Sequence, residues 1–96
     1  MEIIKNSEDK KLSVALVGRL DTSTAPDLEA ALNLEGYEEL VFDFTGLEYI
    51  SSAGLRTLLS AQKTMNKQGK MVLTNVNETV MEVLEITGFL DILTVE

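Results

Sequence analysis

The chain has 96 residues, carries a formal net charge of −8 and contains neither cysteine nor histidine. These two absences exclude disulfides, Ser-His-Asp and Cys-His catalytic machinery and ordinary zinc sites, so we expect a protein that is not an enzyme and needs no metal or cofactor. The acidic charge repels nucleic acid and anionic membranes and therefore favours a protein as the binding partner.

Length and apolar pattern predict a single domain over residues 1–96. A chain of this size forms one domain with a modest core. No apolar run approaches the roughly 20 residues that a membrane helix needs. Residues 1–6 (MEIIKN) lack the basic start and the apolar segment of a signal peptide. We therefore expect a cytoplasmic protein.

In chain order, the pattern first predicts an antiparallel hairpin and then a helix. Residues 3–6 (IIKN) and 12–17 (LSVALV) form strands on either side of a polar turn, and residues 18–21 (GRLD) end the second strand. Residues 22–27 (TSTAPD) begin the helix, because hydroxyl side chains cap helices and proline fits the first turn. Gly36 stops this helix.

Strands and helices alternate in the rest of the chain. Residues 40–44 (LVFDF) are almost continuously apolar, which is typical of a central strand covered on both faces. The pattern then predicts a helix over 53–67, a strand over 70–74, a helix capped by Asn77 and closed at Gly88, and an optional last strand over 92–95. This order predicts an α/β fold with a mixed sheet of four to five strands and helices packed against it.

Polar side chains follow three of the predicted strands, where functional residues of open α/β sheets gather. Asp21 follows the second strand, two serines follow the third, and residues 74–77 (TNVN) follow the fourth. If the second and third strands are adjacent, Asp21 and Ser52 are close neighbours. Asp21 is a candidate for partner binding and equally a candidate cap for the helix that begins near Thr24.

The serine pair at the start of the longest predicted helix has two interpretations. In one, one serine caps the helix and the other is an exposed loop residue; in the other, a serine accepts a phosphate, which a helix N-terminus stabilises. Gly54 is a poor helix former, so it serves either close packing on the sheet or access for a partner. Arg56 has three candidate roles: it contacts a partner, it pairs with Asp21, or it is an exposed side chain without a specific contact.

Three separated motifs resemble the STAS domain family (sulfate transporter and anti-sigma factor antagonist). G-R-L-D at 18–21 resembles the family's G-x-[LI]-D turn. D-F-T-G-L-E-Y-I-S-S-A-G-L at 43–55 resembles its D-[LF]-[ST]-x-[LV]-x-[FY]-[IM]-D-S-x-G-[LV] segment, and I-T-G-F-L-D-I at 86–92 resembles its closing T-G-L-x-x-[IL]. Because these motifs span nearly the whole chain, the resemblance implies the STAS fold.

The stand-alone members of this family are bacterial anti-sigma factor antagonists, so the resemblance implies partner switching. The dephosphorylated antagonist binds an anti-sigma factor that is also a serine kinase, and a sigma factor is released. Phosphorylation of the antagonist ends this complex, and a PP2C-type phosphatase resets it. By position, the resemblance makes Ser52 the phosphoacceptor, with Ser51 in place of the family's usual aspartate and Arg56 where many antagonists have glycine. The implied partner-binding residues are Asp21, Thr22, Ser51, Ser52, Ala53, Gly54 and Arg56.

Two other classes of function compete with this one. A STAS accessory subunit of a transporter or another regulatory complex would bind its partner constitutively, without a phosphate cycle. A nucleotide-binding module is disfavoured, because the chain has neither a G-x-x-x-x-G-K-[ST] nor a G-x-G-x-x-G motif.

Overall fold

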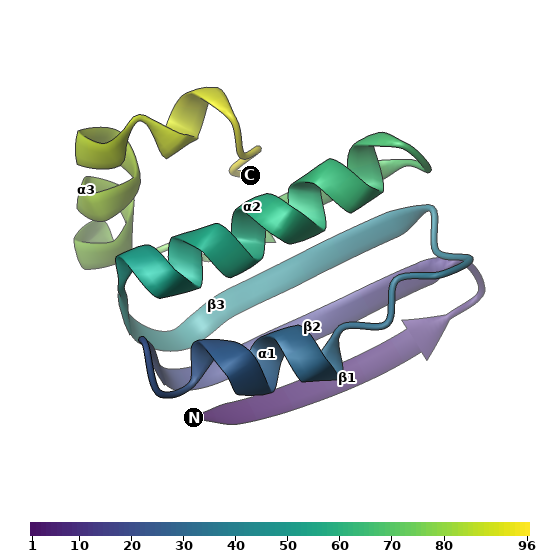
Figure 1. Ribbon diagram of the computed structural model, residues 1–96, viewed down its shortest axis with the longest axis horizontal. Coiled ribbons are helices and arrows are strands. Elements are labelled where there is room, and N and C mark those ends of the chain that lie inside the picture. The colour runs from purple at the N-terminus through teal and green to yellow at the C-terminus, as the bar shows by residue number, and fades with distance from the viewer.

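The computed structural model describes all 96 residues as a mixed four-stranded sheet with helices packed against it (Figure 1). The elements are β1 (Glu2–Glu8), β2 (Lys11–Leu20), α1 (Ala25–Ala31), β3 (Glu39–Ile50), α2 (Ser52–Asn66), β4 (Lys70–Thr74), α3 (Glu78–Thr87) and the short 3-10 helix η1 (Phe89–Asp91). The strands lie in the order β1-β2-β3-β4; β1 is antiparallel to β2, and β2, β3 and β4 run parallel. The predicted α/β fold with a mixed sheet is confirmed.

The core lies between one face of the sheet and the helices. Alternate apolar side chains of β2 and β3, including Leu16, Phe42 and Phe44, are fully buried together with Leu58 of α2. Figure 1 shows α1 and α2 side by side in front of the sheet. The prediction that the strand at 40–44 is covered on both faces is wrong, because Val41 and Asp43 on its other face are only half-buried.

The two central strands are longer than the sequence predicts. β2 continues to Leu20 and β3 continues to Ile50, so residues 45–50, which lie beyond the strand predicted over 40–44, are also strand. The pairing shifts register between Ala15 and Val17 of β2, where Gly46 of β3 comes close. A Cβ on Gly46 would lie 2.9 Å from Cγ2 of Val17, so glycine lets the strands pair closely through this irregularity without displacing Val17.

Helix α1 ends earlier than predicted, at Ala31 rather than near Gly36. Its C-cap residue is extended, which turns the chain so that Leu34 is buried in the core. The side-chain amide of Gln68 donates hydrogen bonds to the backbone oxygens of Leu34 and of Tyr37, the latter at 2.7 Å. The long-range contacts of Leu34 and Gln68 therefore end the helix, and the local glycine does not.

The optional last strand over 92–95 is reduced to a single bridge. Leu73 of β4 pairs in parallel with Val95, and its backbone N–H donates to the oxygen of Thr94 at 2.8 Å. Leu93 is buried next to this bridge in the core. The sheet therefore keeps four strands, and the C-terminal segment covers part of the edge of β4.

Candidate functional site at the start of helix α2

The end of β2 and the start of α2 meet at the carboxyl edge of the sheet. β2 and β3 are adjacent, and the backbone N–H of Ser51 donates to the oxygen of Leu20 at 2.9 Å. Asp21 directly follows Leu20, and Ser52 directly follows Ser51. The sequence predicts that Asp21 and Ser52 are close neighbours if β2 and β3 are adjacent, and this condition is met.

The structure gives the two serines different roles. Ser51 is the N-cap of α2: its backbone is extended, and its hydroxyl accepts a hydrogen bond from the N–H of Gly54 at 3.3 Å. Ser52 is the first residue of the helix and is exposed, and its hydroxyl has no hydrogen-bond partner within the chain. One hydroxyl is thus used to cap the helix, whereas the other is accessible from solvent.

Gly54 allows α2 to lie close to the sheet. It is buried, and a Cβ at this position would lie 2.7 Å from Cγ of Leu20 and 3.0 Å from Cγ1 of Ile50. Of the two interpretations of this glycine, close packing is the one that its surroundings support. Gly54 therefore contributes to the site by setting the position of Ser52, two residues earlier.

Asp21 holds the turn that leads into α1. One carboxylate oxygen accepts hydrogen bonds from the backbone N–H of Ser23 at 3.0 Å and of Thr24 at 3.2 Å. It also accepts from the hydroxyl of Ser23 at 2.7 Å, and these bonds hold the pKa of Asp21 below its ordinary value, with the Ser23 hydroxyl as the largest cause. Thr24, the N-cap residue of α1, makes no side-chain cap bond, so Asp21 organises this turn.

Arg56 follows Ser52 by one helical turn and does not pair with Asp21. Its Nε donates to the backbone oxygen of Ser52 at 3.5 Å, and the side chain is exposed. The carboxylate of Asp21 instead faces Arg19, with 3.8 Å between Nε and Oδ2. Thr22, Ala53 and Arg56 line one groove of about 470 Å³ between α1 and α2, so the structure brings three of the predicted partner-binding residues together.

Sequence reasoning missed the interaction of Arg19 with Tyr49. The guanidinium lies 4.5 Å from the centre of the Tyr49 ring, and the two residues are paired neighbours on β2 and β3. Such a cation–π contact fixes the arginine beside Asp21. Only the strand register could have revealed it, and the register depends on the irregularity at Gly46.

Asp43 supports a second part of the same sheet edge. Its Oδ1 accepts from the backbone N–H of Thr45 and from the side-chain amide of Asn75, each at 3.0 Å. Hydrogen bonds from the hydroxyl of Thr45 and then from Asn75 hold the pKa of Asp43 below its ordinary value. Asp43 therefore ties β3 to the loop that leads into α3.

The architecture defines a small α/β domain with a serine-started helix at the carboxyl edge of its sheet. A family model for the STAS domain matches residues 2–96, and the chain belongs to this family. It is 38% identical over 96 residues to BtrV of Bordetella bronchiseptica, which is named as a candidate anti-sigma factor antagonist; the match covers 96% of this chain and 83% of that protein. It is 29% identical over 97 residues to the anti-sigma-B factor antagonist of Listeria monocytogenes, covering 97% of this chain and 85% of the relative.

Solved structures show the same fold. An anti-sigma factor antagonist from Mycobacterium paratuberculosis superposes with a TM-score of 0.86 at 22% sequence identity, over 98% of this chain and 83% of the other. None of the helices here is both long and apolar enough to span a lipid bilayer.

Proposed function

We propose that this protein is an anti-sigma factor antagonist that acts by partner switching and is not itself an enzyme. The unmodified form binds an anti-sigma factor with serine kinase activity and thereby frees a sigma factor. The kinase then phosphorylates Ser52, which ends the complex, and a PP2C-type phosphatase restores the binding form. The names of the Bordetella and Listeria relatives support this class of function. All of these partners meet in the cytoplasm, and none of the contacts involves nucleic acid.

The observation that carries the proposal is the unequal use of the two serines. Ser51 is engaged as the helix cap, whereas the Ser52 hydroxyl is exposed and without a partner. A kinase can therefore reach Ser52 without unwinding the helix. A phosphate on Ser52 would lie at the N-terminus of α2, where free N–H groups and the helix dipole favour negative charge by about 0.3–1 kcal/mol.

Serine in place of the family's usual aspartate at position 51 is compatible with this switch. Serine and aspartate are both preferred N-cap residues, so the cap is kept. The neutral side chain also removes a negative charge beside the acceptor, so a phosphate on Ser52 meets less repulsion. Arg56, one turn further along the helix and without an acidic partner, lies on the same side as the phosphate.

The proposed binding surface surrounds Ser52. Asp21 and Thr22 lie on the adjacent turn, and Ala53 and Arg56 line the neighbouring groove. Phosphorylation would place about two negative charges in the middle of this surface. We expect the charge and bulk to block docking directly while the fold stays intact.

Phosphorylation of point variants tests the site. The protein is incubated with ATP and the purified anti-sigma factor kinase of its source bacterium, and phosphate incorporation is measured by mass spectrometry. Ser52→Ala should abolish incorporation, whereas Ser51→Ala, the matched control, should retain it. Equal phosphorylation of Ser52→Ala and the wild type would show that the site assignment is wrong.

Binding measurements test the switch. Titration calorimetry with the same anti-sigma factor should show that phosphorylation of Ser52 weakens binding at least about 100-fold, or about 2.8 kcal/mol. Amide shifts should be confined to the start of α2 and the turn at Asp21; shifts throughout the sheet would contradict a surface switch. Equal binding of both forms would favour the accessory-subunit alternative.

A further inference from the structure

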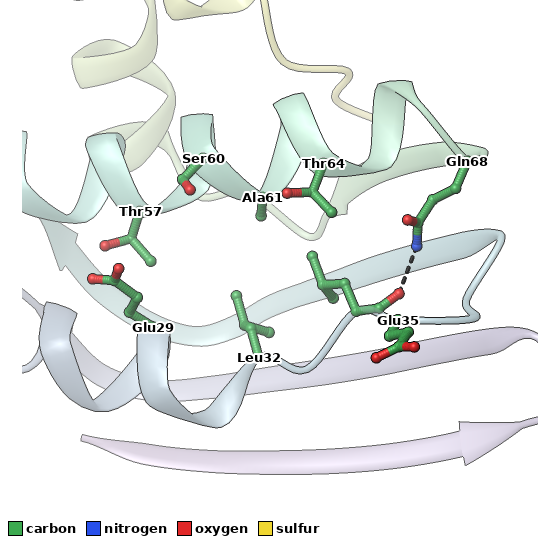
Figure 2. A pocket seen from close by; sticks show the side chains of 9 residues that line it. Glu29, Leu32, Glu35, Thr57, Ser60, Ala61, Thr64 and Gln68 are labelled. Carbon is green, nitrogen blue, oxygen red and sulfur yellow. Dashed lines mark hydrogen bonds between the residues drawn. The ribbon is translucent and has the colours of Figure 1, made fainter.

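A second groove continues along α2, away from Ser52, and has a volume of about 350 Å³ (Figure 2). Its polar lining consists of the carboxylates of Glu29 and Glu35, the hydroxyls of Thr57, Ser60 and Thr64, and the amide of Gln68. Its apolar lining consists of Leu32, Leu34 and Ala61. This surface is called the α1–α2 groove below. It combines an apolar floor with acidic and hydroxyl groups.

Most of its polar groups are free to bind something else. Neither Glu29 nor Glu35 belongs to an ion pair; the ion pairs of the structure are Lys10–Glu38, Arg19–Asp21 and Lys70–Glu39. The hydroxyls of Ser60 and Thr64 have no hydrogen-bond partner within the chain, whereas that of Thr57 donates to the oxygen of Ala53 at 3.3 Å. The α1–α2 groove therefore presents two unpaired carboxylates and two free hydroxyls.

This combination suits one class of side chain. Lysine and arginine have an apolar stem and a charged head that donates several hydrogen bonds. The stem can cover Leu32 and Ala61 while the head meets the carboxylates and hydroxyls. At long range the net charge of −8 also attracts a basic partner. The groove is thus complementary in charge and in shape to a basic, partly apolar segment.

The α1–α2 groove is continuous with the proposed switch surface. Glu29, Thr57 and Ser60 line both this groove and the one that contains Thr22 and Arg56. Figure 2 shows Glu29 and Thr57 pointing toward the same part of the groove. A protein docked over Ser52 would therefore extend along α2 into the α1–α2 groove.

We propose that the α1–α2 groove is a second contact surface for the anti-sigma factor and binds a basic segment of that protein. The inference rests on the proposed function and adds the chemistry of the partner. It also divides the interface in two: the α1–α2 groove supplies affinity, and the start of α2 supplies the response to phosphorylation. The two properties are then separable by mutation.

A double variant with a matched control tests this division. Glu29→Gln with Glu35→Gln removes the two groove carboxylates, and Glu82→Gln with Glu85→Gln removes two exposed carboxylates of α3, with the same change in net charge. Binding to the purified anti-sigma factor is measured at low and at high salt. The groove variant should bind at least about tenfold more weakly and depend less on salt. The control should stay within about twofold of the wild type.

The outcomes separate the two proposals. If the groove variant and the control bind equally well, the α1–α2 groove is not a contact surface, although the proposed function stands. If the groove variant binds weakly, and phosphorylation weakens its binding by the same factor as in the wild type, both proposals are supported. If the groove variant no longer responds to phosphorylation, the division of the interface is wrong.

A direct titration covers the case in which the wild type does not bind the anti-sigma factor and the proposed function fails. Isotope-labelled protein is titrated with a synthetic amphipathic peptide carrying arginines, with the same peptide carrying neutral citrulline as control. Amide shifts at Ser60 and Thr64 with the arginine peptide alone would support a basic-segment site. Equal shifts, or none, would overturn it. Tighter binding of free spermidine than of the peptide would also overturn it, because the occupant would then be a small cation.

Discussion

Helices α2 and α3 begin in closely related ways at the same edge of the sheet. Each follows a parallel strand through a short connection, and each starts with an extended N-cap residue. The hydroxyl of Ser51 accepts from the N–H of Gly54 at 3.3 Å, and the side chain of Asn77 accepts from the N–H of Val80 at 2.8 Å. In both helices, the side chain of the N-cap residue therefore accepts a hydrogen bond from a backbone N–H group of the first turn that would otherwise be unpaired.

The two helices differ in the residue that directly follows the cap. In α3 this residue is Glu78, whose carboxylate complements the positive end of the helix dipole permanently. In α2 it is Ser52, and the first turn of α2 contains no acidic residue. A phosphate on Ser52 would therefore supply the charge that α3 always carries. We therefore expect the start of α2 to accept this charge without a conformational change.

The two helices also differ in packing, and the largest stability effect is expected at Gly54, the third residue of α2. Gly54→Ala would bring a Cβ within 2.7 Å of Cγ of Leu20 and 3.0 Å of Cγ1 of Ile50, at a cost of about 2–3 kcal/mol, against about 1 kcal/mol gained in helix propensity. We expect a net loss of about 1–2 kcal/mol in the free energy of unfolding, measured by urea denaturation. The exposed Ser60→Ala should change it by less than about 0.5 kcal/mol. If Gly54→Ala is as stable as the wild type, the close approach of α2 to the sheet does not require glycine at this position.

Removing the caps should affect α3 more than α2. Asn77→Ala loses the 2.8 Å cap bond and also the bond from its side-chain amide to the oxygen of Leu47 at 2.7 Å, so we expect a loss of about 1–2 kcal/mol. Ser51→Ala loses one longer bond and should cost about 0.5–1 kcal/mol. Thermal unfolding of both variants checks the order. The reverse order would mean that α2 depends on its cap more than the geometry indicates.

The sequence predicts that two serines lie at the start of α2, but it does not predict which of them caps the helix. Spacing and residue type place two serines at the start of the helix. Which serine caps depends on where the preceding strand ends, and β3 stays paired with β2 as far as Ile50 through a register shift beside Gly46, which leaves room for Val17. That contact joins residues far apart in the sequence, so local pattern cannot reveal it.

The same reason explains the other differences between prediction and structure. The order of strands and helices follows from apolar periodicity and is confirmed. The end of α1 depends on Gln68, whose side chain bonds to the loop residues Leu34 and Tyr37 more than thirty positions earlier in the sequence. Glycine at position 36 is a local signal of helix termination that these long-range bonds override.

Arg56 should stabilise the start of α2 once Ser52 carries a phosphate, by pairing with that phosphate. A phosphate and an arginine four residues later face each other on a helix, and an exposed pair of this kind is worth about 0.3–1 kcal/mol. Arg56→Gln should therefore lower the melting temperature of the phosphorylated protein and leave that of the unmodified protein nearly unchanged. A double-mutant cycle with Ser52→Ala isolates the pair. Equal effects on both forms would show that Arg56 does not contact the phosphate.

The smallest expected effect is a pH dependence that distinguishes the two helix starts. Asp43 holds Asn75 in the loop before α3, and its hydrogen bonds lower its pKa below the ordinary value of 3.8. Because the folded pKa is lower than the unfolded one, the stabilisation is complete above about pH 4 and is lost as pH falls through the folded pKa. Its size should be a few tenths of a kcal/mol, since the carboxylate is partly solvated.

The Ser51 cap of α2 does not titrate in this range. Asp21, the carboxylate on the adjacent turn, also titrates below its ordinary pKa, but it bonds to Ser23 and Thr24 and not to the cap, so acidification should leave the cap of α2 unchanged. We expect the amide signals of Thr45 and Asn75 to shift below about pH 4 in a pH titration followed by NMR, while the amide of Gly54 stays unchanged. Asp43→Asn, the matched control, should remove the titration at Thr45. Parallel shifts of Gly54 and Asn75 would mean that the two helix starts respond as one unit, and α2 would then not be an independently switchable element.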